Sequence, residues 1–202
     1  MKLQIMIVLG TMYLFSCKAQ QSKTTCELNY EKAETEIGNY SKSSNTDYLK
    51  AAQLFLDSSL YCNETRKKSI QRKIQVFYLQ KVFKEGAMFV DTLKNSDFEF
   101  EYEKQMYKND LAGLGYAEIN DIKKRDSAFN VSITNIQYYI DKNKYTKFSA
   151  DTVAFYSLYY TKSKIFDTIR ISNEINVLKQ KFPKDKAAID RMKEIIIESM
   201  IH

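Results

Sequence analysis

The sequence predicts an all-α protein, and three observations support this prediction. Only 5 Gly and 1 Pro occur among 202 residues, whereas a β-sandwich or barrel of this length needs many turns rich in both. Large apolar side chains recur at three- and four-residue steps, the spacing of one buried helical stripe. The 44% hydrophobic and 28% charged residues are typical of a globular chain. We expect one helical domain over residues 26–202, preceded by a tether over 17–25 and an apolar leader over 1–16.

The first two expected helices are separated by a polar loop, residues 41–45. A helix over 27–40 is predicted by the stripe of Tyr30, Ala33, Ile37 and Tyr40. Asn45 or Thr46 is suited to cap a second helix over 46–62. The expected inner face of that helix consists of Tyr48, Ala51, Ala52, Phe55 and Ser59.

The third and fourth helices follow each other almost without a break, over 63–81 and 83–93, with Asn63 as the expected cap. The third helix turns Ile70, Ile74 and Phe77 inward, and the fourth uses Phe83, Gly86, Val90 and Leu93.

A fifth helix is expected over 98–118, where an acidic start suits the positive end of the helix dipole. Gly113 and Gly115 lie in its interior, and each costs about 1 kcal/mol relative to Ala. We expect these glycines to allow a neighbouring helix to approach closely.

Four further helices complete the chain. The sixth covers 122–141, and residues 142–149 are predicted to form a flexible joint. Ser149 is the expected cap of a seventh helix that reaches residue 162. The eighth carries an apolar stripe from Ile165 to Leu178 and ends before Pro183, because the residue before proline disfavours helical geometry. The last helix is expected over 184–201.

Cys26 and Cys62 lie at equal sequence separations on either side of Ser44, near the centre of the first loop. Residues equidistant from the turn of an antiparallel hairpin lie side by side, so the two thiols are expected to meet at its open end. A disulfide there closes a loop of about 36 residues, worth roughly 3–4 kcal/mol in the chain-entropy model. The alternative is two buried free thiols.

A weak internal repeat runs along the helices. Its clearest pair, 35 residues apart, is Tyr48-x-x-Ala51-x-x-x-Phe55 and Phe83-x-x-Gly86-x-x-x-Val90. With Leu114-Gly115 and Phe182-Pro183, this pattern resembles the tetratricopeptide family over about residues 27–183. The resemblance implies antiparallel helical hairpins stacked as a superhelix whose concave side grips a peptide or protein segment. The alternative is an irregular helical bundle.

The first seventeen residues are typical of an export signal. Met1-Lys2 precedes an apolar run from Leu3 to Phe15, and the chain turns polar at Lys18. Leu14, Ser16 and Cys17 resemble the lipobox of bacterial lipoproteins, in which the cysteine is lipidated after cleavage. The resemblance implies cleavage after residue 16 and a lipid on Cys17. The alternative is an ordinary secretory signal cut after Ser16 or near Ala19.

The sequence offers little for catalysis. Its only histidine is the terminal His202, and a chain end is a poor place to hold a base within hydrogen-bonding reach. Two cysteines are too few for a structural zinc site, and no glycine-rich phosphate loop follows a strand. We expect no catalytic residue, no metal and no cofactor. The alternative is a small-ligand-binding protein or an enzyme that uses only carboxylates.

Two further patterns concern partners. The formal charge of +6 is dispersed among acidic residues, which for an exported chain argues against nucleic acid as a partner. Tyrosines exceed what a core needs, and tyrosine is favoured at protein interfaces. Packing between helices is the alternative explanation for Tyr102, Tyr107, Tyr116, Tyr138, Tyr139, Tyr156, Tyr159 and Tyr160.

These patterns predict an outer-membrane lipoprotein facing the periplasm that acts as a scaffold or adaptor for envelope proteins. It would be attached to the membrane through its N-terminal lipid and would bind a protein or peptide partner. Lys18-Ala19-Gln20-Gln21 lacks acidic residues that resemble a surface-export signal, which favours the periplasmic side over the cell surface or a soluble periplasmic form. An alternative function is accessory lipoprotein of an outer-membrane assembly or secretion machine.

Overall fold

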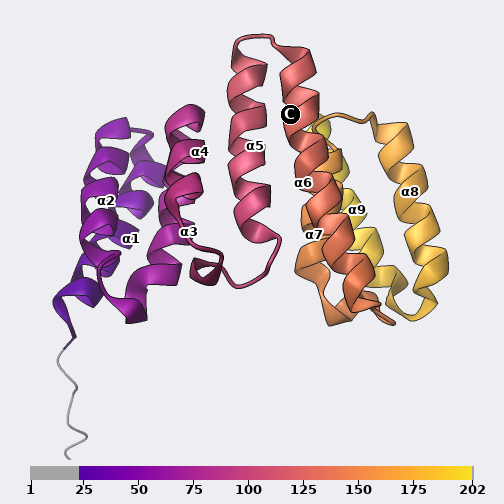
Figure 1. Cartoon of the computed structure of the whole chain (residues 1–202), viewed down its shortest axis with the longest axis horizontal. Coiled ribbons are helices and arrows are strands. Elements are labelled where there is room, and N and C mark those ends of the chain that lie inside the picture. The colour runs from indigo at the N-terminus through magenta and orange to yellow at the C-terminus, as the bar shows by residue number, and fades with distance from the viewer. Residues whose placement is uncertain (1–22, 202) are drawn as a thin grey trace, which may run out of the picture.

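The computed structural model describes residues 23–201, and this range is all-α (Figure 1). It contains nine α-helices and three short 3-10 helices, and no strand occurs within it. No helix in these residues is both long and apolar enough to cross a membrane. The expected lipidation site, Cys17, lies outside the described residues.

The helices follow the predicted order closely. The α-helices are α1 (Thr25–Ser43), α2 (Thr46–Ser59), α3 (Asn63–Gln80), α4 (Phe83–Thr92), α5 (Glu103–Glu118), α6 (Ile122–Asn143), α7 (Thr152–Lys162), α8 (Thr168–Lys181) and α9 (Lys186–Ile201). The 3-10 helices are η1 (Asn95–Asp97), η2 (Phe148–Ala150) and η3 (Pro183–Asp185).

Consecutive helices from α1 to α7 pack against each other and α8 packs against α9, so the molecule forms a row from α1 and α2 at one end to α8 at the other (Figure 1). Its core is correspondingly divided into three clusters along the row, centred on α1–α3, on α3–α5 and on α5–α9. Each helix thus buries its apolar stripe mainly against neighbours close in sequence.

Capping side chains and left-handed turns explain how a chain with few glycines makes its connections. Thr24 and Glu27 form a reciprocal capping box before α1. Asn45, Asp121 and Asp167 each accept a backbone N–H at a later helix start. Helices α1, α3 and α6 end on left-handed residues that are not glycine: Ser44, Lys81 and Lys144. These turns replace the glycine caps that the composition lacks.

The buried face of α2 matches the prediction at Ala52 and Ser59 and differs at the other positions. Leu49, Ala52 and Leu56 are fully buried, whereas Tyr48 and Phe55 are only half-buried. Two stripes with helical spacing run side by side along this helix, and the aliphatic one faces the core. Lys32 lies over the Phe55 ring, with its Nζ 5.5 Å from the ring centre. Within α2, the repeat pattern noted above therefore follows the half-buried stripe.

The predicted start of the fifth helix and two predicted caps are wrong. Residues 98–102 precede α5 as a loop, because the Glu103 carboxylate accepts the backbone N–H groups of Glu99 and Phe100 at 2.8 and 3.0 Å. Asp151, rather than Ser149, caps α7 by accepting the Ala154 N–H at 2.9 Å. Cys62 occupies the N-cap position of α3 without a side-chain cap, and Asn63 is its first helical residue.

The segment predicted as a flexible joint is anchored to the core. Helix α6 continues to Asn143, and Phe148 in η2 is buried. The Tyr145 hydroxyl donates to Asp151 Oδ2 at 2.8 Å. Aromatic side chains in a polar-looking loop thus attach α6 to α7.

The structure joins Cys26 and Cys62 in a disulfide, with their Cα atoms 6.2 Å apart. Cys26 lies in the first turn of α1, and Cys62 immediately precedes α3. The bond therefore closes the open end of the α1–α2 hairpin, as the equal spacing about Ser44 predicts.

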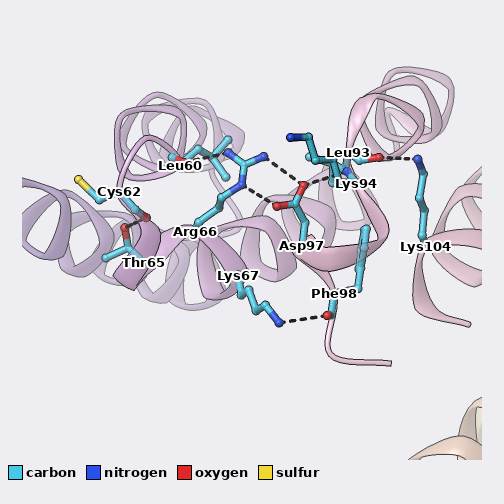
Figure 2. A network of polar contacts seen from close by, with 10 residues as sticks. All are labelled: Leu60, Cys62, Thr65, Arg66, Lys67, Leu93, Lys94, Asp97, Phe98 and Lys104. Carbon is cyan, nitrogen blue, oxygen red and sulfur yellow. Dashed lines mark hydrogen bonds and ion pairs between the residues drawn. The ribbon is translucent and has the colours of Figure 1, made fainter. Parts of the chain in front are cut away.

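Beside this disulfide, Arg66 and Asp97 form an ion pair that we call the clamp (Figure 2). Arg66 donates to the two Asp97 carboxylate oxygens at 2.7 and 3.1 Å and to the Leu60 carbonyl at 3.1 Å. The Lys94 N–H donates to Asp97 Oδ2 at 2.9 Å. Hydrogen bonding from Arg66 lowers the pKa of Asp97. The clamp ties α3 to the η1 turn between α4 and α5.

Candidate functional site

The three cysteines singled out in the sequence do not form a binding pocket among the described residues. Cys26 and Cys62 are bridged, and Cys17 cannot be placed because it precedes the described residues. Across residues 23–201, no group of three or more His, Cys, Asp or Glu side chains is arranged to hold a metal ion.

The candidate site is a groove formed on α5 between α3 and α7, which we call the tyrosine groove. It consists of two hollows of about 460 and 500 Å³ that share Tyr78 and Tyr107. The first, called the Asp110 hollow, is lined by Tyr78, Lys81, Phe83, Met106, Tyr107, Asp110, Leu114, Phe129, Tyr156, Ser157, Tyr160, Thr161 and Lys164. The second is lined by Gln71, Ile74, Gln75, Tyr78, Glu99, Phe100, Glu103, Tyr107 and Val153.

Helical periodicity explains why these side chains converge. On α5, Tyr107, Asp110 and Leu114 follow one another at steps of three and four residues, so they share one face. On α7, Tyr156 and Tyr160 share a face in the same way. The other face of α7 carries Phe155, Leu158 and Tyr159 into the core. Each helix therefore supports the groove with one stripe and the core with another.

The wall behind the Asp110 hollow depends on a glycine. A Cβ atom at Gly113 would lie 2.8 Å from Phe129 Cζ of α6, closer than packed carbon atoms approach. The predicted close approach of a neighbouring helix is therefore confirmed at Gly113. It is not found at Gly115, where a Cβ would lie 3.6 Å from Phe83 Cβ, an ordinary contact.

Asp110 is the unusual polar residue of the groove. Its Oδ2 atom accepts the Thr161 hydroxyl at 3.3 Å, but its Oδ1 atom is buried and has no hydrogen-bond partner in the described part of the chain. Burial raises the pKa of the Asp110 carboxyl to about 6, although the nearby Ser132 and Thr161 hydroxyls and the charge of Lys164 act in the opposite direction. At pH 7.5 the carboxyl is therefore mostly ionised, despite being enclosed.

Aromatic rings surround this carboxyl. The rings of Tyr156 and Tyr160 stack with centroids 5.8 Å apart. The ammonium group of Lys164 lies 3.9 Å from the Tyr160 ring centre. Burial raises the pKa of Tyr107 to about 12 and that of Tyr78 well above its usual range, so both rings are neutral at physiological pH. The arrangement suits a ligand that brings a hydrogen-bond donor or a cation to Asp110.

Sequence reasoning found part of this site. It singled out Tyr107, Tyr156 and Tyr160, which line the groove. It missed Asp110, because an aspartate after Lys108 and Asn109 looks like a solvated helix face. The available signal was its spacing from Tyr107 and Leu114, which places the carboxylate on an otherwise apolar face.

The other highlighted tyrosines are distributed differently. Tyr102 and Tyr159 are buried in the core, and Tyr139 packs partly against it. Tyr138 projects from α6 with 67% of its surface exposed and lines neither hollow. Core packing therefore accounts for some of the tyrosine excess and the groove for another part.

Comparisons of the chain with protein-family models, curated proteins and solved structures found no match. A functional proposal therefore rests on the groove and on the sequence patterns.

Proposed function

We propose that this protein is a lipid-anchored adaptor of the periplasm that binds an extended segment of another envelope protein in the tyrosine groove. The observation that supports the proposal is the pair of hollows joined across Tyr78 and Tyr107. One small molecule fills one hollow, whereas a chain segment can place successive side chains in both.

The composition of the groove favours a protein partner. Tyrosine provides an apolar ring and a polar tip at little cost in conformational entropy, which explains its enrichment in protein recognition. Four tyrosines from three helices line the Asp110 hollow: Tyr78, Tyr107, Tyr156 and Tyr160. Because they project from helices, their positions are largely fixed before a ligand binds, and little ordering remains to be done on association.

The tetratricopeptide resemblance supports the same proposal. It implies a stack of hairpins whose concave side grips a peptide, and the groove involves the alternate helices α3, α5 and α7. We propose that this side of the row is the recognition surface. No individual contact residue is transferred from the family.

Anchorage is the second part of the proposal. The lipobox-like end of the leader, Leu14 to Cys17, supports a lipid on Cys17 and attachment to the outer membrane. A disulfide such as Cys26–Cys62 persists most readily in an oxidising compartment. The adaptor would therefore present its groove to the periplasm while the lipid keeps it at the membrane.

Site-specific photocrosslinking in native cells tests the proposal. A benzophenone amino acid replaces Tyr156, which lines the groove, and in a control chain replaces Tyr138, which is exposed on α6 outside it. We expect one protein to be crosslinked from position 156 and not from position 138. Crosslinking from neither position, or the same products from both, would contradict recognition by the groove.

The same experiment with Cys17→Ala tests the anchor. We expect this variant to leave the membrane fraction. If its crosslinked product persists, the lipid serves only to localise the protein. If the product disappears, the membrane is what brings the partners together. An unchanged membrane association would contradict lipidation of Cys17.

A further inference from the structure

The Asp110 hollow is lined by a carboxylate that its neighbours satisfy only in part. Its Oδ2 atom accepts the Thr161 hydroxyl and the charge of Lys164 lies nearby, but its Oδ1 atom is buried and has no hydrogen-bond partner among residues 23–201. Buried polar atoms in folded proteins are nearly always paired, and a buried ionised group without a partner is costly. A group that enters from outside the described chain can supply the missing partner.

The chemistry of the hollow specifies that group. A carboxylate accepts hydrogen bonds and cannot donate them, so the entering group must be a donor, and a cationic donor forms the stronger, charge-assisted bond. Tyrosine faces attract cations, and the hollow already shows such a contact where the Lys164 ammonium lies 3.9 Å from the Tyr160 ring centre. The tyrosine rings also offer apolar surface to a methylene chain.

We infer that the Asp110 hollow binds one lysine or arginine side chain of the partner segment, with the Asp110 carboxylate as its counter-ion and the tyrosine rings around its methylene groups. This inference rests on the adaptor function proposed above. The continuation into the second hollow, through Tyr78 and Tyr107, accommodates the neighbouring residues of the segment.

The rim of the hollow adds selectivity. Lys81 and Lys164 line the same hollow as Asp110. A second positive charge close to the bound one would meet these ammonium groups and be repelled. The preferred segment therefore carries one isolated basic residue and is not polybasic.

Binding of fluorescein-labelled peptides, measured by anisotropy with the full-length lipidated protein in detergent, tests the inference. The probes are Ala-Ala-X-Ala-Ala peptides with blocked ends, in which X is lysine, arginine, norleucine or acetyl-lysine. We expect the lysine and arginine peptides to bind at least tenfold more tightly than the two neutral ones at pH 7.5. Equal binding of lysine and norleucine peptides, or no binding of any peptide, would overturn the inference.

Two variants locate the effect. Asp110→Asn keeps the shape of the side chain and removes its charge, so we expect the preference for lysine over norleucine to fall below twofold. Asp91→Asn removes an exposed carboxylate of α4 that pairs with Lys108 outside the hollow, and the preference should remain. A preference that survives Asp110→Asn would refute the role of this carboxylate.

Competition with n-butylamine distinguishes a side chain from a free small amine. We expect the lysine peptide to bind at least tenfold more tightly than n-butylamine, because its neighbours occupy the second hollow. Equal affinities would overturn the side-chain assignment.

The two proposals can fail separately. Crosslinking from position 156 without discrimination between charged and neutral peptides would support the adaptor function and refute the cation site. Charge-dependent peptide binding without crosslinking would support the cation site and refute the adaptor function.

The pH dependence of binding provides an independent readout. The other titratable groups that line the hollow are Tyr78 of α3, Lys81 just after it, Tyr107 of α5, Tyr156 and Tyr160 of α7, and Lys164 just after α7. With an Asp110 pKa of about 6, the ionised fraction falls about tenfold between pH 7.5 and 5.0. We expect the dissociation constant of the lysine peptide to rise about tenfold over this range. The Asp110→Asn variant should show no such rise, and a flat profile in the unmodified protein would contradict the inference.

Discussion

Asp97 in the η1 turn and Asp110 within α5 are both enclosed carboxylates, yet their environments differ. Asp97 receives hydrogen bonds from Arg66 and from the Lys94 backbone, and the pKa of its carboxyl is lowered. Asp110 receives one from Thr161, leaves Oδ1 unpaired, and has its pKa raised to about 6. The same residue type therefore stabilises the fold at the clamp and destabilises it in the groove. An unpaired charge in a hollow is what a binding site requires and what a structural site avoids.

The largest test concerns the disulfide beside the clamp. In a Cys17→Ala background, Cys26→Ala with Cys62→Ala should lower the free energy of unfolding by about 3–4 kcal/mol, because a closed loop of 36 residues is released in the unfolded chain. Urea denaturation with and without dithiothreitol measures the change. The variant lacking both cysteines should not respond to the reductant. An unchanged midpoint for the reduced parent would show that the bond does not stabilise this end of the molecule.

Breaking the clamp should have the next largest effect. Asp97→Asn leaves Arg66 without its counter-ion and should lower the free energy of unfolding by about 2 kcal/mol at pH 7. Arg66 is 38% exposed, and solvent screening keeps the loss below that of a fully buried pair.

The pH profile of this variant provides its control. The folded pKa of Asp97 is lowered, so its contribution is present above the unfolded value of about 3.9 and disappears as the pH falls through the folded value. The free energies of unfolding of the parent and of Asp97→Asn should therefore become similar at acidic pH. Asp47→Asn, at an exposed pair with Lys50, should change stability by no more than about 0.5 kcal/mol.

The corresponding Asp-to-Asn substitution in the groove should stabilise the protein instead of destabilising it. Asp110→Asn should raise the free energy of unfolding by about 1–2 kcal/mol at pH 7.5, because it removes an enclosed, ionised carboxylate whose Oδ1 atom lacks a partner. The folded pKa, about 6, exceeds the unfolded value of about 3.9. The stabilising effect of the bound proton is therefore full below pH 4 and is lost as the pH rises through 6.

Urea denaturation between pH 4 and 7.5 tests this reversal of sign. The free energy of unfolding of Asp110→Asn should increasingly exceed that of the parent as the pH rises, and the two values should be similar near pH 4. A variant less stable than the parent at pH 7.5 would mean that Asp110 already has a favourable partner in the fold.

The smallest expected effect concerns how tightly the wall behind the Asp110 hollow is packed. Gly113→Ala should lower the free energy of unfolding by about 1 kcal/mol, because the new methyl group overlaps the Phe129 ring. Gly115→Ala provides the matched control. Its methyl group meets only an ordinary contact, so the better helix propensity of alanine should raise stability by up to about 1 kcal/mol. Equal effects in thermal denaturation would show that the wall behind Asp110 yields easily.

The fold class and the hairpin with its disulfide were predictable because they depend on local spacing. Few glycines and prolines, stripes of helical period, and two cysteines equidistant from Ser44 are all visible in the chain. The buried face of α2 was predicted correctly at Ala52 and Ser59 and wrongly at Tyr48 and Phe55, because two stripes with helical spacing lie one residue apart. The start of α5 was predicted too early because the Glu103 carboxylate holds the N–H groups of the preceding loop.

The candidate site was less predictable, for a physical reason. Tyrosines are recognisable as interface candidates, but whether a tyrosine lines a hollow or the core depends on which helices flank it. Asp110 becomes unusual only through burial by α3 and α7, which lie far from it in sequence. Its chemistry is a property of tertiary packing.

The disulfide also determines how mechanical force would pass through the molecule. A pull applied through the N-terminal tether reaches Cys26 in the first turn of α1 and crosses the covalent bond directly to Cys62 at the start of α3. The hairpin between the two cysteines lies outside this covalent path. Its 36-residue segment, about 120 Å when extended, cannot be drawn out until the bond is reduced. If the N-terminus is fixed to a membrane, the covalent path that carries tension from a bound partner in the groove to the anchor bypasses α2 and all of α1 beyond its first turn.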